Sequence, residues 1–369
     1  MADGTADTPA PMQSRALPRL RPRLEMRQNA SGLRTAAMIA AGLAVGLGLS
    51  ALILIASGVR PGDLVNEFVV LIFSSPKNIS AVLVQAAPMI IVGLSASIAF
   101  KARFWNIGIE GQMIFGAIGA TLVATFDIGP EGLRLPLMAL AAALGGIAWI
   151  ALPAVLKLRL GVNEIISTLL LNYVALNFLL HLLYGPWQDP ISAFPHSEQF
   201  EESERLASLG WQNLNASLIV ALVLTGLVTI ALTASRVGYL LNFIHTNATM
   251  ARAVGVPVAM LTLAAALGSG ALSGLAGFTI SAGIEYRMTQ SFFIGYGFSG
   301  ILIAFLARNN PIGATVVALF VAVLMVAGQS LQVFYQIPFA MVQLIQAIIV
   351  ICVAASDFFI RHRVQWLAG

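Results

Sequence analysis

The side chains of this chain that could do chemistry gather in short segments between long apolar runs. The first segment, Phe100–Gln112, carries two cations, two amides and an acid: Lys101, Arg103, Asn106, Gln112 and Glu110. Asn106 can cap a helix that starts at Ile107, which places Glu110 in the first turn, where the helix dipole favours a negative charge. Because a carboxylate at the centre of a bilayer costs roughly 3 kcal/mol or more, we expect Glu110 near a membrane interface. Two roles stay open for it, a structural brace or a gate on a solute pathway.

The second segment, Lys157–Thr168, repeats this design. Two cations come first, Asn163 is the expected helix cap, and Glu164 follows in the first turn. Neutral hydrogen-bonding side chains continue along the same helix: Ser167, Thr168, Asn172, Tyr173 and Asn177. Positions 168, 172 and 176 share one helix face. Such a stripe suits an uncharged polar solute, and it suits hydrogen bonds between helices equally well.

The third segment is Ser235–Pro257. It is the longest of the loops that the charge distribution described below places on the cytoplasmic side of a membrane. Asn247 is a good helix cap, and good helix formers follow it: Ala248, Met250, Ala251, Arg252 and Ala253. Gly255 is a natural C-terminal stop before Pro257. We therefore expect a short cytoplasmic helix, suited to lie in a groove of another protein; a capped turn is the alternative.

Several kinds of chemistry are excluded. A single cysteine, Cys352, rules out an internal disulfide framework and a cysteine-based metal cluster. The chain has no G-x-x-x-x-G-K-[ST] sequence with which to hold ATP phosphates. His181 is the one histidine expected inside a span, and neither a Ser/His nor a paired-Asp arrangement accompanies it. We therefore predict no catalytic residue, no metal site, no enzymatic activity and no nucleic-acid partner.

The elements that position these segments are membrane helices. Hydrophobic residues make up 58% of the chain and charged residues only 10%, against roughly 25% charged in a soluble domain. Lipid must therefore be the solvent for most of the chain, and the predicted fold class is an all-α polytopic membrane protein. A span takes ~20 apolar residues. About ten runs qualify: Thr35–Gly58, Ala81–Phe100, Ile107–Phe126, Pro136–Leu156, Ile165–Leu183, Ala216–Ala234, Val258–Ala282, Phe292–Leu306, Ile312–Ser330 and Pro338–Ile360.

The distribution of positive charge predicts the orientation. With both termini in the cytoplasm, most of the 20 Lys and Arg residues fall in inner segments, as the positive-inside rule requires. Residues 1–34 are then a flexible basic cytoplasmic tail, 35–360 the transmembrane domain and 361–369 a cytoplasmic C-terminal tail. The inner loop is 235–257 and the large outer loop is 184–215. Val59–Ser80 is expected to be an amphipathic outer helix, and Ala282–Ser291 is a further outer segment that could join the large loop.

Three motifs carry a resemblance to a known family. Trp105–Gln112 reads Trp-Asn-Ile-Gly-Ile-Glu-Gly-Gln, Gly161–Tyr173 is a second signature, and Gly295–Ile301 through Asn310–Gly313 is a third. On these motifs the chain resembles the permease subunits of bacterial ABC importers, in the ribose and branched-chain amino-acid permease class. The likeness is greatest to the simple-sugar and nucleoside branch, in which Phe stands at the place of Trp105.

The resemblance implies how the protein would work. In that family the inner loop carries a coupling helix that docks on the ATPase, with the pattern Asn-Pro-Glu-Ala-Ala-Arg-x-x-Gly-Ile. Asn247, Ala251, Arg252 and Gly255 fit this pattern, whereas Ala248, Thr249 and Met250 replace Pro, Glu and Ala. The resemblance also implies a bacterial inner-membrane location and three kinds of partner. These are a second permease subunit, an extracytoplasmic solute-binding protein and cytoplasmic ATPase subunits that use ATP and magnesium.

The leading hypothesis is thus an importer permease for nucleosides or related neutral sugar-like solutes, with Asn106, Glu110, Gln112, Asn163, Glu164, Asn172 and Tyr173 as candidate pathway or gate residues. Simple sugars or branched-chain amino acids are alternative solutes. An ion-coupled secondary transporter is the alternative of a different class. That mechanism needs charged residues near the bilayer midplane, and the apolar runs offer almost none.

Overall fold

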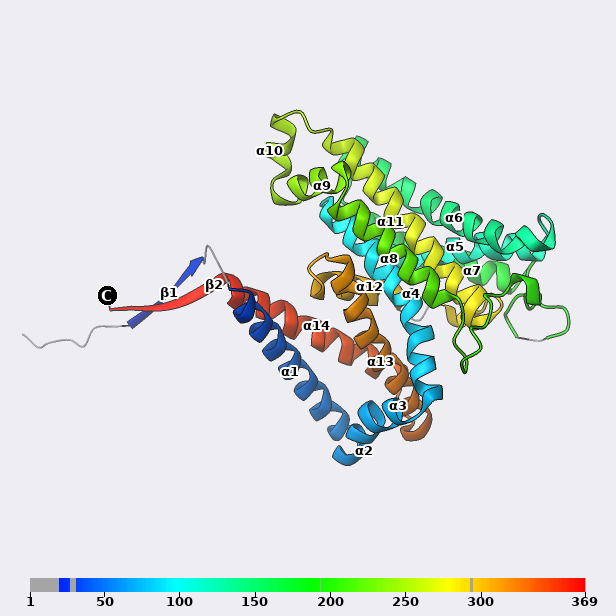
Figure 1. Cartoon of the computed structure of the whole chain (residues 1–369), viewed down its shortest axis with the longest axis horizontal. Helices are drawn as coiled ribbons and strands as arrows, with labels where there is room; N and C mark the ends of the chain where they lie inside the picture. The colour runs from blue at the N-terminus through cyan, green and yellow to red at the C-terminus, as the bar shows by residue number, and fades with distance from the viewer. Residues whose placement is uncertain (1–19, 27–30, 193, 293–294, 369) are drawn as a thin grey trace, which may run out of the picture.

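The computed structural model describes residues 20–26, 31–192, 194–292 and 295–368, and almost all of them are helical (Figure 1). The α-helices are α1 Gly32–Ala56, α2 Pro61–Val65, α3 Leu71–Ser74, α4 Pro76–Lys101, α5 Ile109–Thr125, α6 Glu131–Leu160, α7 Glu164–Leu183, α8 Ser217–Thr233, α9 Arg236–Thr246, α10 Ala248–Ala253, α11 Val258–Ile280, α12 Tyr296–Leu306, α13 Pro311–Tyr335 and α14 Phe339–Arg361. Wider π-helical turns occupy Asn66–Val70 and Ser281–Glu285, and 3₁₀ turns occupy Glu202–Glu204 and Gln290–Phe292.

Each of the ten predicted apolar runs contains one helix, but not all of these helices are long enough to span. In the described part of the chain, seven helices are long and apolar enough to cross a membrane: α1, α4, α6, α7, α11 with its π-helical extension, α13 and α14. The pair α8 and α9 passes the same test with a bend of 69° between them. Helices α5 and α12 have only 17 and 11 residues. Eleven residues rise about 16 Å, half of a hydrocarbon core, so the expected number of ten spans is not confirmed.

Small residues hold the centre of the bundle together. Helix α4 is the most buried span and packs against α8, α11, α12 and α13. Helices α5, α6 and α11 pack so closely that a Cβ added at Gly270 would lie 2.6 Å from the carbonyl oxygen of Gly146. A Cβ added at Gly274 would likewise meet the backbone of Ala142, and one added at Gly116 would meet the backbone of Gly274. In lipid, such close backbone approach provides the van der Waals contact that keeps helices associated.

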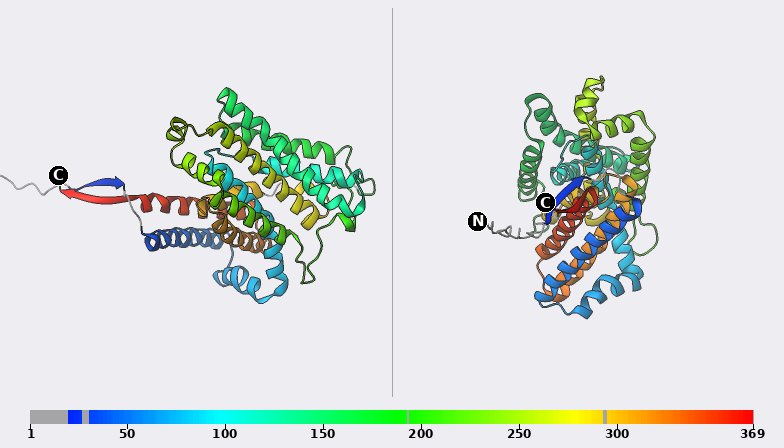
Figure 2. Two further views of the ribbon diagram at one scale, coloured as in Figure 1. Left: turned by 45° about the horizontal axis from the view of Figure 1, so that its top comes forward. Right: turned by 90° about the vertical axis from the view of Figure 1, so that its left-hand side faces the viewer.

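Helices α1 and α14 form a second, outlying pair. They run side by side at an angle to the main bundle, as both figures show (Figures 1 and 2). Gly42 and Gly46 line this contact, because a Cβ added at either would press against α14 near Cys352 and Ile349. Gly42 and Gly46, like Gly270 and Gly274, are four residues apart, so a GxxxG pair lies at each of two separate helix contacts.

The two ends of the described chain pair with each other. Strand β1, Leu20–Met26, runs antiparallel to β2, His362–Ala368, with Leu20 opposite Ala368. The expected flexible tail over 1–34 and C-terminal tail over 361–369 therefore contain paired strands, and α1 begins at Gly32, earlier than predicted. The rest of that tail before Ser31, and Gly369, lie outside the described residues. Pairing of the strands brings both ends to one side of the molecule (Figure 1).

The loop 184–215, which the sequence predicts to be the large outer loop, folds back onto the segment after α11. Backbone groups of Ser197, Phe200 and Leu206 donate to carbonyls of Met288, Tyr286 and Ala282 at 2.8–2.9 Å. At the base of the loop, Arg134 contacts Asp127, Glu201 and Glu204 at 2.8, 3.1 and 3.2 Å. Ala282–Ser291 thus joins the outer loop, and the two segments make one folded surface.

Candidate solute pathway and coupling site

The carboxylate of Glu110 binds the N-terminus of the short helix α12. Its Oε1 accepts a hydrogen bond from the backbone N–H of Gly295 at 2.9 Å, and Oε2 accepts from that of Gly297. Gly295 lies in the left-handed region, at φ +85°, and a Cβ at Gly297 would come within 2.6 Å of the Glu110 carboxylate. A buried negative charge is thereby paired with N–H groups that have no partner within their own helix. These contacts are those of a structural brace between α5 and α12.

The amides of Asn106 and Gln112 belong to a buried neutral network. Asn106 Nδ2 donates to Gln112 Oε1 at 3.0 Å and to Ser269 Oγ at 2.9 Å, and Gln112 Nε2 donates back to Asn106 Oδ1 at 2.9 Å. Ser95 Oγ lies 2.8 Å from the hydroxyls of both Ser269 and Ser273. The network therefore ties the Phe100–Gln112 segment and α5 to α4 and α11.

Asn106 is not the helix cap that its position predicted. Helix α5 begins at Ile109 rather than Ile107, and its cap position is taken by Gly108. Asn106 Oδ1 still accepts a backbone hydrogen bond, from Gly108 N at 3.0 Å. The amide is turned toward Gln112 and Ser269 because packing against α11 offers it side-chain partners that an isolated helix end lacks.

The polar face of α7 holds the start of α5. Asn172 Oδ1 accepts from Gly111 N and its Nδ2 donates to the carbonyl of Ile107, both at 2.9 Å, while Thr168 Oγ1 accepts from Ile107 N at 3.2 Å. Tyr173 points elsewhere, with 56% of its surface exposed. Of the predicted stripe, Thr168 and Asn172 therefore bond between helices in this structure, and Tyr173 lies outside their network.

The connection between the end of α6 and the start of α7 contains the other predicted acid. Asn163 caps α7 by accepting from Ile165 N at 2.8 Å. Glu164 pairs with Lys157, and Lys157 Nζ also donates to the Arg103 carbonyl at 3.1 Å. The two charged segments of the sequence are thus neighbours in space, joined by this ion pair.

The predicted coupling segment is helical and projects from one end of the bundle (Figure 1). Asn247 Oδ1 caps α10 by accepting from Thr249 N and Met250 N at 3.1 and 3.0 Å. Ala251 is fully buried against the bundle, whereas Arg252 is exposed. Gly255 ends the turn at φ +84°, as predicted for a C-terminal stop. One face of α10, which begins at Ala248, is left open to solvent.

Arg103 connects this coupling segment to the transmembrane helices. Its Nε donates to the His245 carbonyl at 3.0 Å and its Nη2 to the Thr246 carbonyl at 3.1 Å, at the C-terminal end of α9. A cation there is favoured by the helix dipole and occupies carbonyls that lack helical partners. Arg103 lies two residues after the end of α4, so these hydrogen bonds join the end of α9 to the end of α4.

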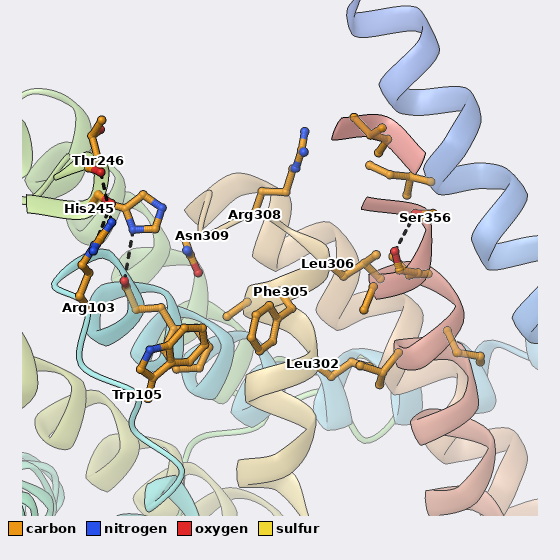
Figure 3. Close-up of a pocket in the computed structure, with 18 residues that line it drawn as sticks. Arg103, Trp105, His245, Thr246, Leu302, Phe305, Leu306, Arg308, Asn309 and Ser356 are labelled. Carbon is orange, nitrogen blue, oxygen red and sulfur yellow. Dashed lines mark hydrogen bonds between the residues drawn. The ribbon is translucent and has the colours of Figure 1, made fainter. Parts of the chain in front are cut away.

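An aromatic cluster borders a cavity of about 760 Å³ between this region and the α1–α14 pair (Figure 3). Phe100, Trp105 and Phe305 all contact one another, with ring centroids 4.9, 5.3 and 5.6 Å apart. Arg103 and His245 line the same cavity beside the coupling segment, and Ile349 of α14 lines it as well.

Sequence reasoning missed the partners that complete these networks. Ser95, Ser269 and Ser273 are hydroxyls in apolar runs, and Gln85 Nε2 donates to Tyr296 Oη at 2.7 Å within the membrane region. The sequence did offer one signal that these residues are functional or structural, namely that they are polar and lie in apolar runs. Their pairing depends on which helices touch, which neighbouring residues in the sequence do not reveal.

The comparisons with known proteins agree with this architecture. The family model described as "Branched-chain amino acid transport system / permease component" matches residues 78–354. The chain is 36% identical over 337 residues to a glucose ABC transporter permease protein of Haloferax volcanii, covering 88% of each chain. It is 29% identical to a guanosine ABC transporter permease protein of Bacillus subtilis, covering 85% of this chain and 91% of that one. A nucleoside ABC transporter permease protein of Lactococcus lactis is 28% identical, with coverage of 75% and 79%.

The fold and the sequence therefore define a multi-pass membrane permease. The chain belongs to the branched-chain amino-acid transport permease family, whose members here are the membrane subunits of ABC transporters. The resemblance inferred from the three sequence motifs is confirmed, including its sugar and nucleoside branch.

Proposed function

We propose that this chain is the transmembrane permease subunit of an ATP-driven importer for nucleosides or related neutral sugar-like solutes. Relatives named for guanosine, nucleosides and glucose support this choice of solute. Ten helices cross or enter a bacterial inner membrane, with both termini in the cytoplasm. The partners are cytoplasmic ATPase subunits that use ATP and magnesium, a second permease subunit and an extracytoplasmic solute-binding protein. The chain is not itself an enzyme and holds no cofactor.

The neutral interior supports an uncharged solute. The buried polar groups of α4, α5 and α11 are hydroxyls and amides, and Glu110 is paired with backbone N–H groups of α12. A charged solute would need an opposite charge close to its path to offset desolvation. The same observation disfavours an ion-coupled transporter, which needs titratable groups near the midplane.

The link between Arg103 and the end of α9 is the single observation that supports ATP-driven coupling most strongly. It joins the exposed helix α10 to α4, the most buried span. We propose that Asn247, Ala248, Ala251, Arg252 and Gly255 form the ATPase-coupling element. Closure of the ATPases then moves α10, and Arg103 transmits this displacement to α4 and to the candidate gate residues Asn106 and Glu110.

The test is uptake and ATPase activity of the complete complex in proteoliposomes. Replacing Arg252 and Gly255 together, as Arg252→Ala with Gly255→Ala, should lower solute-stimulated ATP hydrolysis and uptake at least about tenfold. The Arg is exposed for docking, and Ala at φ +84° distorts the end of the helix at a cost of roughly 1 kcal/mol. Arg159→Ala, in the last turn of α6, is the matched control for loss of an inner cation. Unchanged coupling in the double variant would contradict this assignment.

A further inference from the structure

The cavity beside the coupling segment has the composition of a solute site. Its volume, about 760 Å³, falls in the range of small-molecule pockets, which run from roughly 300 to 1,000 Å³. Trp105 and Phe305 present aromatic surface there, being 40% and 48% exposed, and their rings lie within 27° of parallel. Exposed aromatic faces of this kind stack on planar bases.

Asn309 supplies a polar group that needs a partner. Among the described residues, none donates a hydrogen bond to its Oδ1, although this atom is buried. The residue lines the cavity (Figure 3) and is held in the left-handed region, at φ +57°. A buried acceptor without a donor costs about 1–3 kcal/mol in general, so a rotation of this side chain that turns the oxygen toward a ligand N–H or O–H in the cavity relieves a penalty.

The remaining lining limits which solute fits. Arg103 and Arg308 place positive charge in the lining, which disfavours a cationic ligand, and apolar side chains such as Leu302 and Ile349 line other parts of the cavity. A neutral molecule with one planar aromatic face and several hydroxyl or amino donors matches both parts. A nucleoside has this chemistry, whereas a hexose lacks the aromatic ring.

We infer that this cavity is a nucleoside-binding subsite on the cytoplasmic exit path, with the base against Trp105 and Phe305 and a donor group on Asn309 Oδ1. This inference rests on the proposed import function and names the place where the solute pauses before release. The contact between Arg103 and α9 sets one wall of the subsite, so movement of the coupling segment changes its shape.

Occupancy is measured directly by protection of a cysteine. In a Cys352→Ala background, Ala354→Cys, at an exposed position that lines the cavity and is not one of the proposed contacts, is placed in the purified full complex, and its labelling rate with a maleimide is followed with and without millimolar guanosine. We expect guanosine to slow labelling at least about fivefold and equimolar glucose to leave the rate unchanged. Leu160→Cys, exposed at the inner end of α6 and absent from the cavity lining, should label at one rate throughout.

Paired variants assign the contacts. In the same reporter background, Trp105→Leu and Asn309→Gly should each raise the guanosine concentration needed for half protection about fivefold or more. Trp105→Phe keeps an aromatic face and Asn309→Asp keeps an acceptor that tolerates a left-handed backbone, so both should stay near the parent value. Gly at 309 removes the amide without backbone strain, and size-exclusion chromatography verifies that each complex is intact.

The outcomes separate the subsite from the import function. Guanosine uptake by the wild-type complex without protection of the cysteine would overturn the subsite and leave the import function standing. Equal protection by glucose, or a labelling rate set by anionic lipid instead of guanosine, would overturn it as well. Protection by guanosine without any uptake would support the subsite and count against import.

Discussion

At the scale of single residues, Glu110 shows how a charge is accommodated inside an apolar bundle. Its position in the first turn of α5 is compatible with the dipole of its own helix, but its hydrogen bonds go to a different helix, α12. Each carboxylate oxygen accepts one backbone N–H, at Gly295 and Gly297. The residue therefore fixes where the short helix begins, and α12 in turn satisfies the charge.

The variant Glu110→Gln tests this pairing. A carboxamide has one accepting oxygen and one donating NH₂ group, so one backbone N–H of α12 would face another donor. We expect a loss of roughly 1–3 kcal/mol of stability and a lower melting temperature of the detergent-solubilised protein, with reduced uptake. Glu131→Gln, at an exposed acid in the first turn of α6, should leave both quantities unchanged. Equal melting temperatures for the two variants would show that the Glu110 contacts contribute little.

At the scale of elements, the contact of α11 with α5 and α6 depends on glycine. Gly274 faces the Ala142 carbonyl oxygen and the amide nitrogen of Gly146 across the helix interface, whereas a Cβ at Gly268 of the same helix would meet nothing within 4 Å. Both glycines lie in α11, but only Gly274 contacts a neighbouring helix. Substitutions at the two positions can therefore be compared directly.

Gly274→Ala should therefore separate the helices and destabilise the protein by about 1–3 kcal/mol, the usual cost of overpacking. Gly268→Ala should be neutral or slightly stabilising, because it only removes the conformational freedom of glycine inside a helix. Thermal unfolding of both variants in the same detergent provides the measurement. A stable Gly274→Ala protein would show that the α6–α11 contact adjusts without cost.

At the scale of the whole molecule, the described chain has two parts with different tasks. The main bundle around α4 carries the buried polar networks, and the α1–α14 pair closes the far side of the cavity (Figures 1 and 2). Large apolar side chains cover the outside of α6, α7 and α8, among them Leu144, Leu170 and Leu227. On a membrane protein such surface faces lipid or a partner helix, in agreement with the second permease subunit that we propose.

The energy source of transport is a property of the complete transporter and is tested in cells. In cells that take up guanosine through this system, collapse of the proton gradient with ATP held constant should leave the initial uptake rate within about twofold. Depletion of ATP with the gradient maintained should abolish it, because ABC transport draws its work from ATP hydrolysis in partner subunits. The opposite pattern would favour the ion-coupled alternative.

Local chemistry was predictable from the sequence alone. The apolar runs that match the helices, the caps at Asn163 and Asn247, and the stop at Gly255 all depend on residues within a few positions of one another. The family resemblance also rested on contiguous motifs. The prediction that Asn106 caps a helix starting at Ile107 was wrong, because the same side chain can either cap a local helix or hydrogen-bond across the bundle.

Only the tertiary structure decided which partners the polar residues take. Glu110 binds glycines almost two hundred positions away, and Arg103 binds carbonyls at the end of α9, from opposite halves of the chain. Lipid drives every apolar run to become a helix, so helices follow from composition. It does not choose among helix neighbours, because in lipid that choice depends on close packing and hydrogen bonds between surfaces that meet only in the folded molecule.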